Sequence, residues 1–162
     1  MSKKRKAPLV EEGGAAPAFE LKDLANTNVS LETLLEKKPV VLAFYKVSCP
    51  VCQMTFPFLE RMSGSQTHHF VGISQDHAGA TEGFNSKFGV RFQTLLDSEA
   101  AGYPASNAFG ISHVPTAFLI EPSGKVSWTM EGFSKAQMKE LGDRVGVQPF
   151  TPGEYVPEWK SG

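Results

Sequence analysis

The stretch PVVLAFYKVSCPVCQ (residues 39–53) joins an apolar run to both cysteines of the 162-residue chain. Residues 39–45 are apolar, β-branched or aromatic, which is typical of a strand covered on both faces of a sheet. A helix should begin at or just after Cys49, because Pro50 suits the first helical turn, where its missing N–H is not needed. The stretch therefore predicts a buried strand that runs into a helix, with both thiols at the junction.

The remaining chain alternates predicted strands and helices. Strands are expected at 18–24, 69–74, 92–97, 116–120 and 125–130. Helices are expected at 29–37 with Ser30 as the cap, at 80–89 with Gly89 at the end, at 98–111 with an interruption, and at 134–146 with Ser134 as the cap. This order predicts an α/β fold with a central mixed β-sheet flanked by helices on both faces.

Composition fits one folded domain of ordinary soluble character, with 41% hydrophobic and 20% charged residues. Lys plus Arg total 16 and Asp plus Glu total 17, so the net charge is −1. This balance gives no electrostatic reason to expect nucleic acid or an anionic membrane as a partner. No apolar run approaches the roughly 20 residues that span a bilayer.

The two ends of the chain differ in composition from its middle. Residues 1–16 are charged, small and rich in Pro and Gly, and predict a flexible N-terminal tail. Residues 17–146 are the expected folded domain, and residues 147–162 a Pro-rich, extended C-terminal tail. The basic cluster at residues 3–6 is not followed by the apolar run of a signal peptide, so we expect a cytoplasmic protein.

Two thiols at this spacing admit three chemistries. A structural disulfide is rare in a reducing compartment and closes too short a loop to constrain the unfolded chain. A zinc site needs about four ligands, and the histidines (His68, His69, His77 and His113) show no ligand spacing, so we expect no metal. For a redox pair, the helix N-terminus would stabilise a thiolate on Cys49, and Cys52 could then attack a mixed disulfide. We therefore expect a redox-active Cys49–Cys52 disulfide and no other cofactor.

A second motif, SHVPTAFLI (residues 112–120), places Pro115 directly before a strong strand. Together the two motifs resemble the thioredoxin-like thiol–disulfide oxidoreductases, in the TlpA/ResA-like branch related to the AhpC/TSA (peroxiredoxin) superfamily. The resemblance covers about residues 17–146 and implies a thioredoxin fold in which Pro115 is cis beside the cysteines. It also implies that Cys49 attacks, that Cys52 resolves, and that the backbone of Val114 docks an extended segment of the partner protein.

The chain departs from this family's pattern at three positions near the cysteines. Ala43 stands where thioredoxin has a buried Asp, Thr55 where ResA-like proteins often have a Glu, and Ser48 where a Trp is common. The carboxylates that usually relay protons are therefore missing. Lys46 and Thr55 are the remaining candidates for tuning the pKa of the thiols, and a solvated Lys46 side chain without a role is the favoured alternative for Lys46.

The predicted activity is exchange of electrons with protein thiols and disulfides. We expect an electron donor such as a thioredoxin-type reductase, and a monomer. One alternative is an antioxidant thiol peroxidase of the peroxiredoxin type, but peroxiredoxins carry Pro and Thr or Ser where this chain has Leu42 and Lys46. Another is a non-enzymatic module that docks partners through its aromatic tail residues Phe150, Tyr155 and Trp159.

Overall fold

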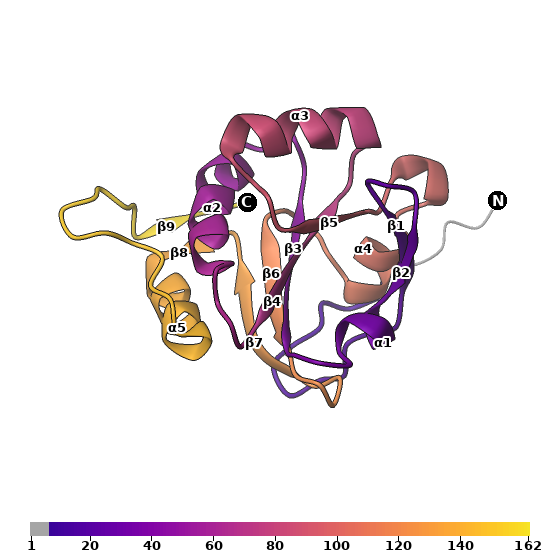
Figure 1. The fold of residues 1–162 in the computed structure, drawn as a ribbon, viewed down its shortest axis with the longest axis horizontal. Coiled ribbons are helices and arrows are strands. Elements are labelled where there is room, and N and C mark those ends of the chain that lie inside the picture. Colours follow the sequence, from indigo (N-terminus) through magenta and orange to yellow (C-terminus); the bar gives the residue numbers. More distant parts are fainter. Residues whose placement is uncertain (1–6) are drawn as a thin grey trace.

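A seven-stranded mixed sheet forms the centre of the fold (Figure 1). The structure is a computed structural model that describes residues 7–162, so the basic cluster at residues 3–6 lies outside the described part. The strand order is β2-β1-β5-β4-β3-β6-β7. The strands of this sheet are β1 Glu20–Asp23, β2 Asn28–Ser30, β3 Val40–Tyr45, β4 His69–Ser74, β5 Gln93–Leu96, β6 Thr116–Ile120 and β7 Val126–Glu131.

The central strands β3, β4 and β5 are parallel, and β6 and β7 add an antiparallel hairpin beside β3. All six residues of β3 are buried, as the apolar run predicted. Its neighbours β4 and β6 pair with its two edges, and layers of side chains cover its two faces. The helices are α1 Leu31–Leu34, α2 Pro50–Met62, α3 Ala78–Phe88, the 3-10 helix η1 Glu99–Ala101, α4 Pro104–Phe109 and α5 Lys135–Val145.

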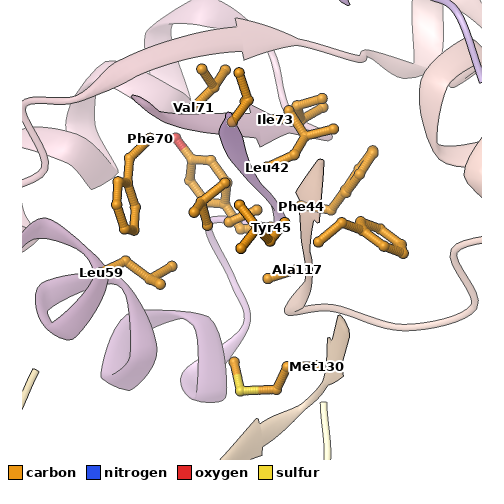
Figure 2. Packing of buried hydrophobic residues seen from close by; sticks show 14 of the residues in the cluster. Leu42, Phe44, Tyr45, Leu59, Phe70, Val71, Ile73, Ala117 and Met130 are labelled. Carbon is orange, nitrogen blue, oxygen red and sulfur yellow. The ribbon is translucent and has the colours of Figure 1, made fainter. Parts of the chain in front are cut away.

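Neighbouring side chains of β3 point to opposite faces of the sheet (Figure 2). On one face the Tyr45 ring packs 4.2 Å from Phe56 of α2 and 4.9 Å from Phe84 of α3, between ring centroids. On the other face the Phe44 ring packs 5.3 Å from Phe109 of α4. Helices therefore cover both faces of the mixed sheet, and the predicted fold class is confirmed.

Local capping explains where the helices begin and end. The Ser30 and Ser134 side chains accept the N–H groups of Thr33 and Gln137, which confirms both predicted N-caps. Gly89 ends α3 in the left-handed conformation, as its position predicted.

The N-terminal residues 7–16 differ from the predicted flexible tail. The Ala7 N–H donates to Asn107 O at 3.1 Å, and the Val10 N–H to Phe109 O at 3.1 Å. Further along, Ala15 forms a β-bridge with Lys125. Composition did not reveal this packing, because the segment is held by backbone hydrogen bonds that any residue except proline can donate.

The C-terminal residues 147–162 are extended, but they also pack on the body of the protein. The Phe150 ring lies 4.9 Å from Phe58 of α2, edge on. Farther on, β9 (Trp159–Lys160) pairs antiparallel with β8 (Phe133–Ser134) in a second small sheet. Of the three aromatic residues in this tail, only Phe150 is packed, since Tyr155 is 89% and Trp159 61% exposed.

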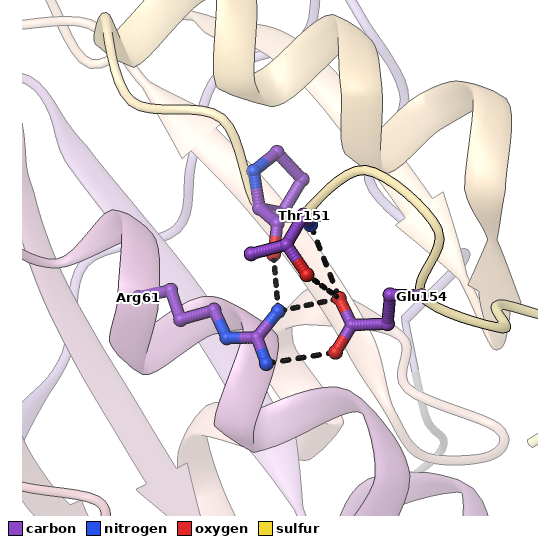
Figure 3. A network of polar contacts seen from close by, with 4 residues as sticks. Arg61, Thr151 and Glu154 are labelled. Atoms are coloured by element: carbon purple, nitrogen blue, oxygen red, sulfur yellow. Dashed lines mark hydrogen bonds and ion pairs between the residues drawn. The ribbon is translucent and has the colours of Figure 1, made fainter.

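Arg61 of α2 anchors this C-terminal segment (Figure 3). Its guanidinium donates two hydrogen bonds to the Glu154 carboxylate, at 2.7 and 2.8 Å, and a third to Pro149 O at 3.0 Å. The Thr151 N–H also donates to Glu154 at 3.2 Å. The hydrogen bond from Arg61, helped by Thr151, lowers the pKa of the Glu154 carboxyl to about 2.

This anchor should weaken in acid. Because the folded-state pKa of Glu154 lies below the unfolded value of about 4.3, its contribution is present above that value and is lost as the pH falls toward about 2. We expect the difference in free energy of unfolding between the wild type and Glu154→Gln to be largest above about pH 5 and to vanish near pH 2. Urea unfolding across this range measures it, with exposed Glu158→Gln as control. A difference that is constant over the range would contradict the prediction.

The outer strand β7 has its carbonyl groups covered by other parts of the chain. Gly13 N–H donates to Val126 O at 2.8 Å. From α5, the Arg144 guanidinium donates to Ser127 O at 3.0 Å, and the Gln137 amide to Thr129 O at 3.1 Å. These contacts fix α5 and the N-terminal segment against the sheet.

Candidate active site

The turn from β3 into α2 presents both thiols at the end of the sheet. Cys49 is the N-cap of α2, and its Sγ accepts the N–H of Cys52 at 3.2 Å. The Cys49 thiol also donates to Val114 O at 3.4 Å. Both thiols are reduced in this structure. Cys49 is half-buried and therefore reachable from solvent, whereas Cys52 lies in the core.

Burial determines the acidity of the second thiol. Removal from water raises the pKa of the Cys52 thiol, and its hydrogen bond with the Cys49 side chain raises it further. A backbone hydrogen bond from Lys46 lowers the pKa of Cys52, but by less than these two effects raise it. Cys52 is therefore a neutral thiol near pH 7, and one cysteine is exposed to reagents while the other is protected.

Alkylation should separate the two cysteines. We expect iodoacetamide to modify the reduced, folded protein once, at Cys49, with Cys52 reacting about a hundredfold more slowly because it is buried and protonated. Peptide mass spectrometry after timed quenching measures both rates. In urea the two should react at similar rates, which serves as the control. Modification of Cys52 before Cys49 in the folded protein would contradict this geometry.

Two side chains fix the loop that leads to Cys49. The Val47 N–H donates to the Asp76 carboxylate at 2.8 Å, and Val47 O accepts the Gln53 amide at 3.0 Å. Asp76 follows β4, whose carboxyl end lies beside that of β3 in the parallel pair. The sequence interpretation gave Asp76 no role, although its place directly after a neighbouring parallel strand was a usable signal.

Neither candidate tuning residue has a hydrogen bond from its side chain to a thiol, among the contacts of the described residues, and the exposed Lys46 side chain agrees with the solvated alternative. The Thr55 hydroxyl is buried and donates to Val51 O at 2.6 Å, one turn back in α2. Its hydrogen bond thus goes to the helix backbone. The Lys46 side chain is exposed, while the Lys46 backbone carbonyl accepts the Cys49 N–H at 3.2 Å. Lys46 therefore contacts the cysteines through its backbone and not through its ammonium group.

The segment before β6 lies against the Cys49 thiol. The Val114–Pro115 peptide bond is cis, and Pro115 O accepts the N–H of Gly132 at 2.8 Å. Beside Val114 is an open cleft of about 240 Å³, lined also by Lys46 and His113. A larger cavity of about 630 Å³ lies near β1, η1 and the start of α3, and neither cysteine lines it. Neither cysteine lines the smaller cleft, but Val114 on its wall accepts the Cys49 thiol through its carbonyl oxygen at 3.4 Å.

Within residues 7–162, no group of three or more His, Cys, Asp or Glu side chains could hold a metal ion. In the same part of the chain, no helix is long and apolar enough to cross a membrane.

Residues 13–129, most of the chain, match the AhpC/TSA family. The chain belongs to the AhpC/TSA family. Within the curated proteins it is similar to thiol-disulfide oxidoreductase ResA of Bacillus subtilis, with 32% identity over 76% of this chain and 69% of the relative. ResA of Halalkalibacterium halodurans is 30% identical over 82% of this chain and 75% of the relative.

Solved structures of a DsbF protein and of a thioredoxin domain agree with the fold. MTB DsbF, in its mixed oxidized and reduced forms, has a TM-score of 0.68 and 30% identity, with 79% of this chain and 92% of that chain covered. The thioredoxin domain of a thiol-disulfide oxidoreductase from Bacteroides vulgatus has a TM-score of 0.74. It is 19% identical and covers 84% of this chain and 99% of its own, so this likeness supports the thioredoxin fold alone.

The peroxidase alternative is less supported within this family. Leu42, where peroxiredoxins carry Pro, is fully buried in β3, and Lys46, where they carry Thr or Ser, is exposed. Neither side chain supplies the hydroxyl that the peroxidase pattern places near the reactive thiol. The relatives named above are thiol–disulfide oxidoreductases.

Proposed function

We propose that this thiol–disulfide oxidoreductase exchanges electrons with protein thiols and disulfides, with Cys49 as the nucleophile and Cys52 as the resolving thiol. The observation that carries the proposal is the position of Cys49 Sγ. It lies between the Cys52 N–H at 3.2 Å and Val114 O at 3.4 Å, half-buried, with the second thiol one helical turn away. A hydrogen bond from an amide to sulfur strengthens when the sulfur is charged, which favours attack by a thiolate.

In the reductive direction, the Cys49 thiolate attacks one sulfur of a substrate disulfide. The substrate S–S bond breaks, a mixed disulfide forms on Cys49, and the first substrate thiolate leaves and takes up a proton. Cys52 then loses its proton and attacks Cys49 Sγ. This step forms the Cys49–Cys52 disulfide and releases the second substrate thiol, so that two electrons have moved from the protein to the substrate.

The protonated state of Cys52 fits this sequence of steps. A neutral, buried thiol does not compete for the incoming disulfide, so the first attack belongs to Cys49. When the mixed disulfide forms, the hydrogen-bond partner of Cys52 becomes the electrophile. We propose that the backbone of Val114 then holds an extended segment of the substrate beside the mixed disulfide, and that a thioredoxin-type reductase returns the electrons.

A redox titration tests the proposed function. The protein is equilibrated with defined thiol–disulfide buffers, and its free thiols are counted after acid quenching. We expect one reversible two-electron transition, at about −250 mV or lower for a reductant and about −150 mV or higher for an oxidant. Absence of a reversible transition would refute the dithiol mechanism. Rapid consumption of hydrogen peroxide by Cys49 without a Cys49–Cys52 disulfide would favour the peroxidase instead.

A further inference from the structure

The last residues of the chain lie against the backbone of Val114, where the proposed substrate segment would dock. We name residues 158–162 the C-terminal strap. It begins where Lys135 N–H donates to Glu158 O at 3.0 Å and continues as β9 beside β8 (Figure 1). In the register of this pair, Lys160 lies opposite Phe133. The strap is therefore an extended segment added to the edge of β8.

Beyond β9 the strap reaches the backbone that faces the thiols. Gly132 has a φ of +67°, and a Cβ on it would lie 3.1 Å from the Gly162 N. A Cβ on Gly162 would in turn collide with Val114 O and lie 2.8 Å from Cδ2 of His113. Two glycines thus permit close approach between the end of the strap and the Val114 backbone.

The same carbonyl is shared by the strap and the reactive thiol. Val114 O accepts the Cys49 thiol at 3.4 Å, and Gly162 lies directly against it. A polypeptide that docks along Val114 would need the space that Gly162 fills. A small disulfide needs only the exposed side of Cys49 and does not have to contact the Val114 backbone.

The strap is held by the β8–β9 pairing and by one further backbone hydrogen bond from Lys135, whereas the segment before it is also anchored by side chains. Lys135 and Glu158 form one ion pair at 3.5 Å, with the Glu158 side chain 85% exposed, and both residues of β9 are exposed. Exposed ion pairs of this kind contribute little. The preceding residues are anchored by the Arg61–Glu154 pair and by Val156, which is buried. The strap can therefore detach while its base stays in place.

We propose that the C-terminal strap competes with polypeptide substrates for Val114, so that it sets the preference of Cys49 between small disulfides and disulfides in extended polypeptides. The inference rests on the proposed function, because it assumes exchange at Cys49. With the strap docked, only the fraction of molecules that have released it can accept a polypeptide. The apparent affinity for such a substrate therefore falls to that fraction of its value without the strap.

The test compares two disulfides in single-turnover reactions with the reduced protein. One is bis(2-hydroxyethyl) disulfide, and the other is a synthetic peptide with one internal disulfide. The variants are a chain that ends at Pro157 and the milder Gly162→Ala, whose methyl group would lift the end of the strap from Val114. Ser161→Ala, an exposed neighbour in the strap, is the matched control. Circular dichroism verifies that each variant is folded.

We expect the shortened chain to react with the peptide about tenfold faster, with its rate toward the small disulfide changed less than about twofold. Gly162→Ala should shift the ratio in the same direction by a smaller factor, and Ser161→Ala should leave it unchanged. An unchanged or lower peptide rate in the two folded strap variants would overturn the inference. If the wild type reacts with neither disulfide, the proposed function itself fails, and the two failures are thereby distinguished.

Discussion

The Cys52→Ser variant is expected to stop at the mixed disulfide and to accumulate covalently bound to its substrate. Cys49 Sγ remains half-buried at the start of α2, so the first attack can proceed. The second attack cannot, because serine supplies no sulfur. In Cys49→Ser the nucleophile itself is lost, and we expect the exchange rate to fall on the order of a thousandfold or more, to the uncatalysed background.

Non-reducing gels and intact-mass measurement after acid quenching distinguish these outcomes. Cys52→Ser should show one substrate-sized adduct that a dithiol reagent removes, whereas Cys49→Ser should show none. Ser48→Ala, an exposed change beside the motif, is the control and should behave like the wild type. Adducts on Cys49→Ser together with none on Cys52→Ser would reverse the assigned roles.

Replacing Asp97 should cause the largest loss of stability outside the apolar core. This carboxylate is buried and accepts the N–H groups of Ala105 at 2.9 Å and Ser106 at 2.7 Å, at the start of α4. Asp97→Ala leaves both amides without a partner in a buried place. Because hydrogen bonds to charged groups contribute about 1.5–3 kcal/mol each, we expect a loss of about 3–5 kcal/mol in the free energy of unfolding.

A graded pair of variants tests this explanation. Asp97→Asn keeps one carbonyl oxygen and should lose roughly half as much stability as Asp97→Ala, because one amide retains an acceptor. Glu99→Ala, an exposed acidic neighbour, should stay within about 0.5 kcal/mol of the wild type. Urea unfolding followed by circular dichroism measures all three. Equal losses in the two Asp97 variants would show that the number of accepted amides is not the cause.

Local patterns in the sequence predicted most of the central fold. The apolar run that became β3, the proline that opens α2, and the caps Ser30 and Ser134 all depend on residues close together in the chain. Such features follow from strand burial and from the hydrogen-bonding needs of helix ends, which adjacent residues determine. The redox interpretation of the two cysteines likewise depended on the junction between one strand and one helix.

The parts that were not predicted depend on contacts between distant segments. Asp76 reaches the Val47 backbone only because β4 lies beside β3 in the sheet. Residues 7–16 were expected to be flexible, since backbone hydrogen bonds leave no signature in side-chain composition. The approach of Gly162 to Val114 depends on the whole fold, and a terminal glycine by itself indicates nothing.

The hydrogen bonds that occupy the outer carbonyl groups of β7 affect the tendency of this protein to aggregate in concentrated solution. An outer strand with unoccupied carbonyl groups is a template on which a second chain can add its own strand, and this is a common route to aggregation. Here the carbonyls of Val126, Ser127 and Thr129 are already hydrogen-bonded to Gly13, Arg144 and Gln137. A neighbouring molecule would have to break these bonds before it could pair with β7. The chain thus protects itself from edge-to-edge growth at this side of the sheet with its own N-terminal segment and last helix.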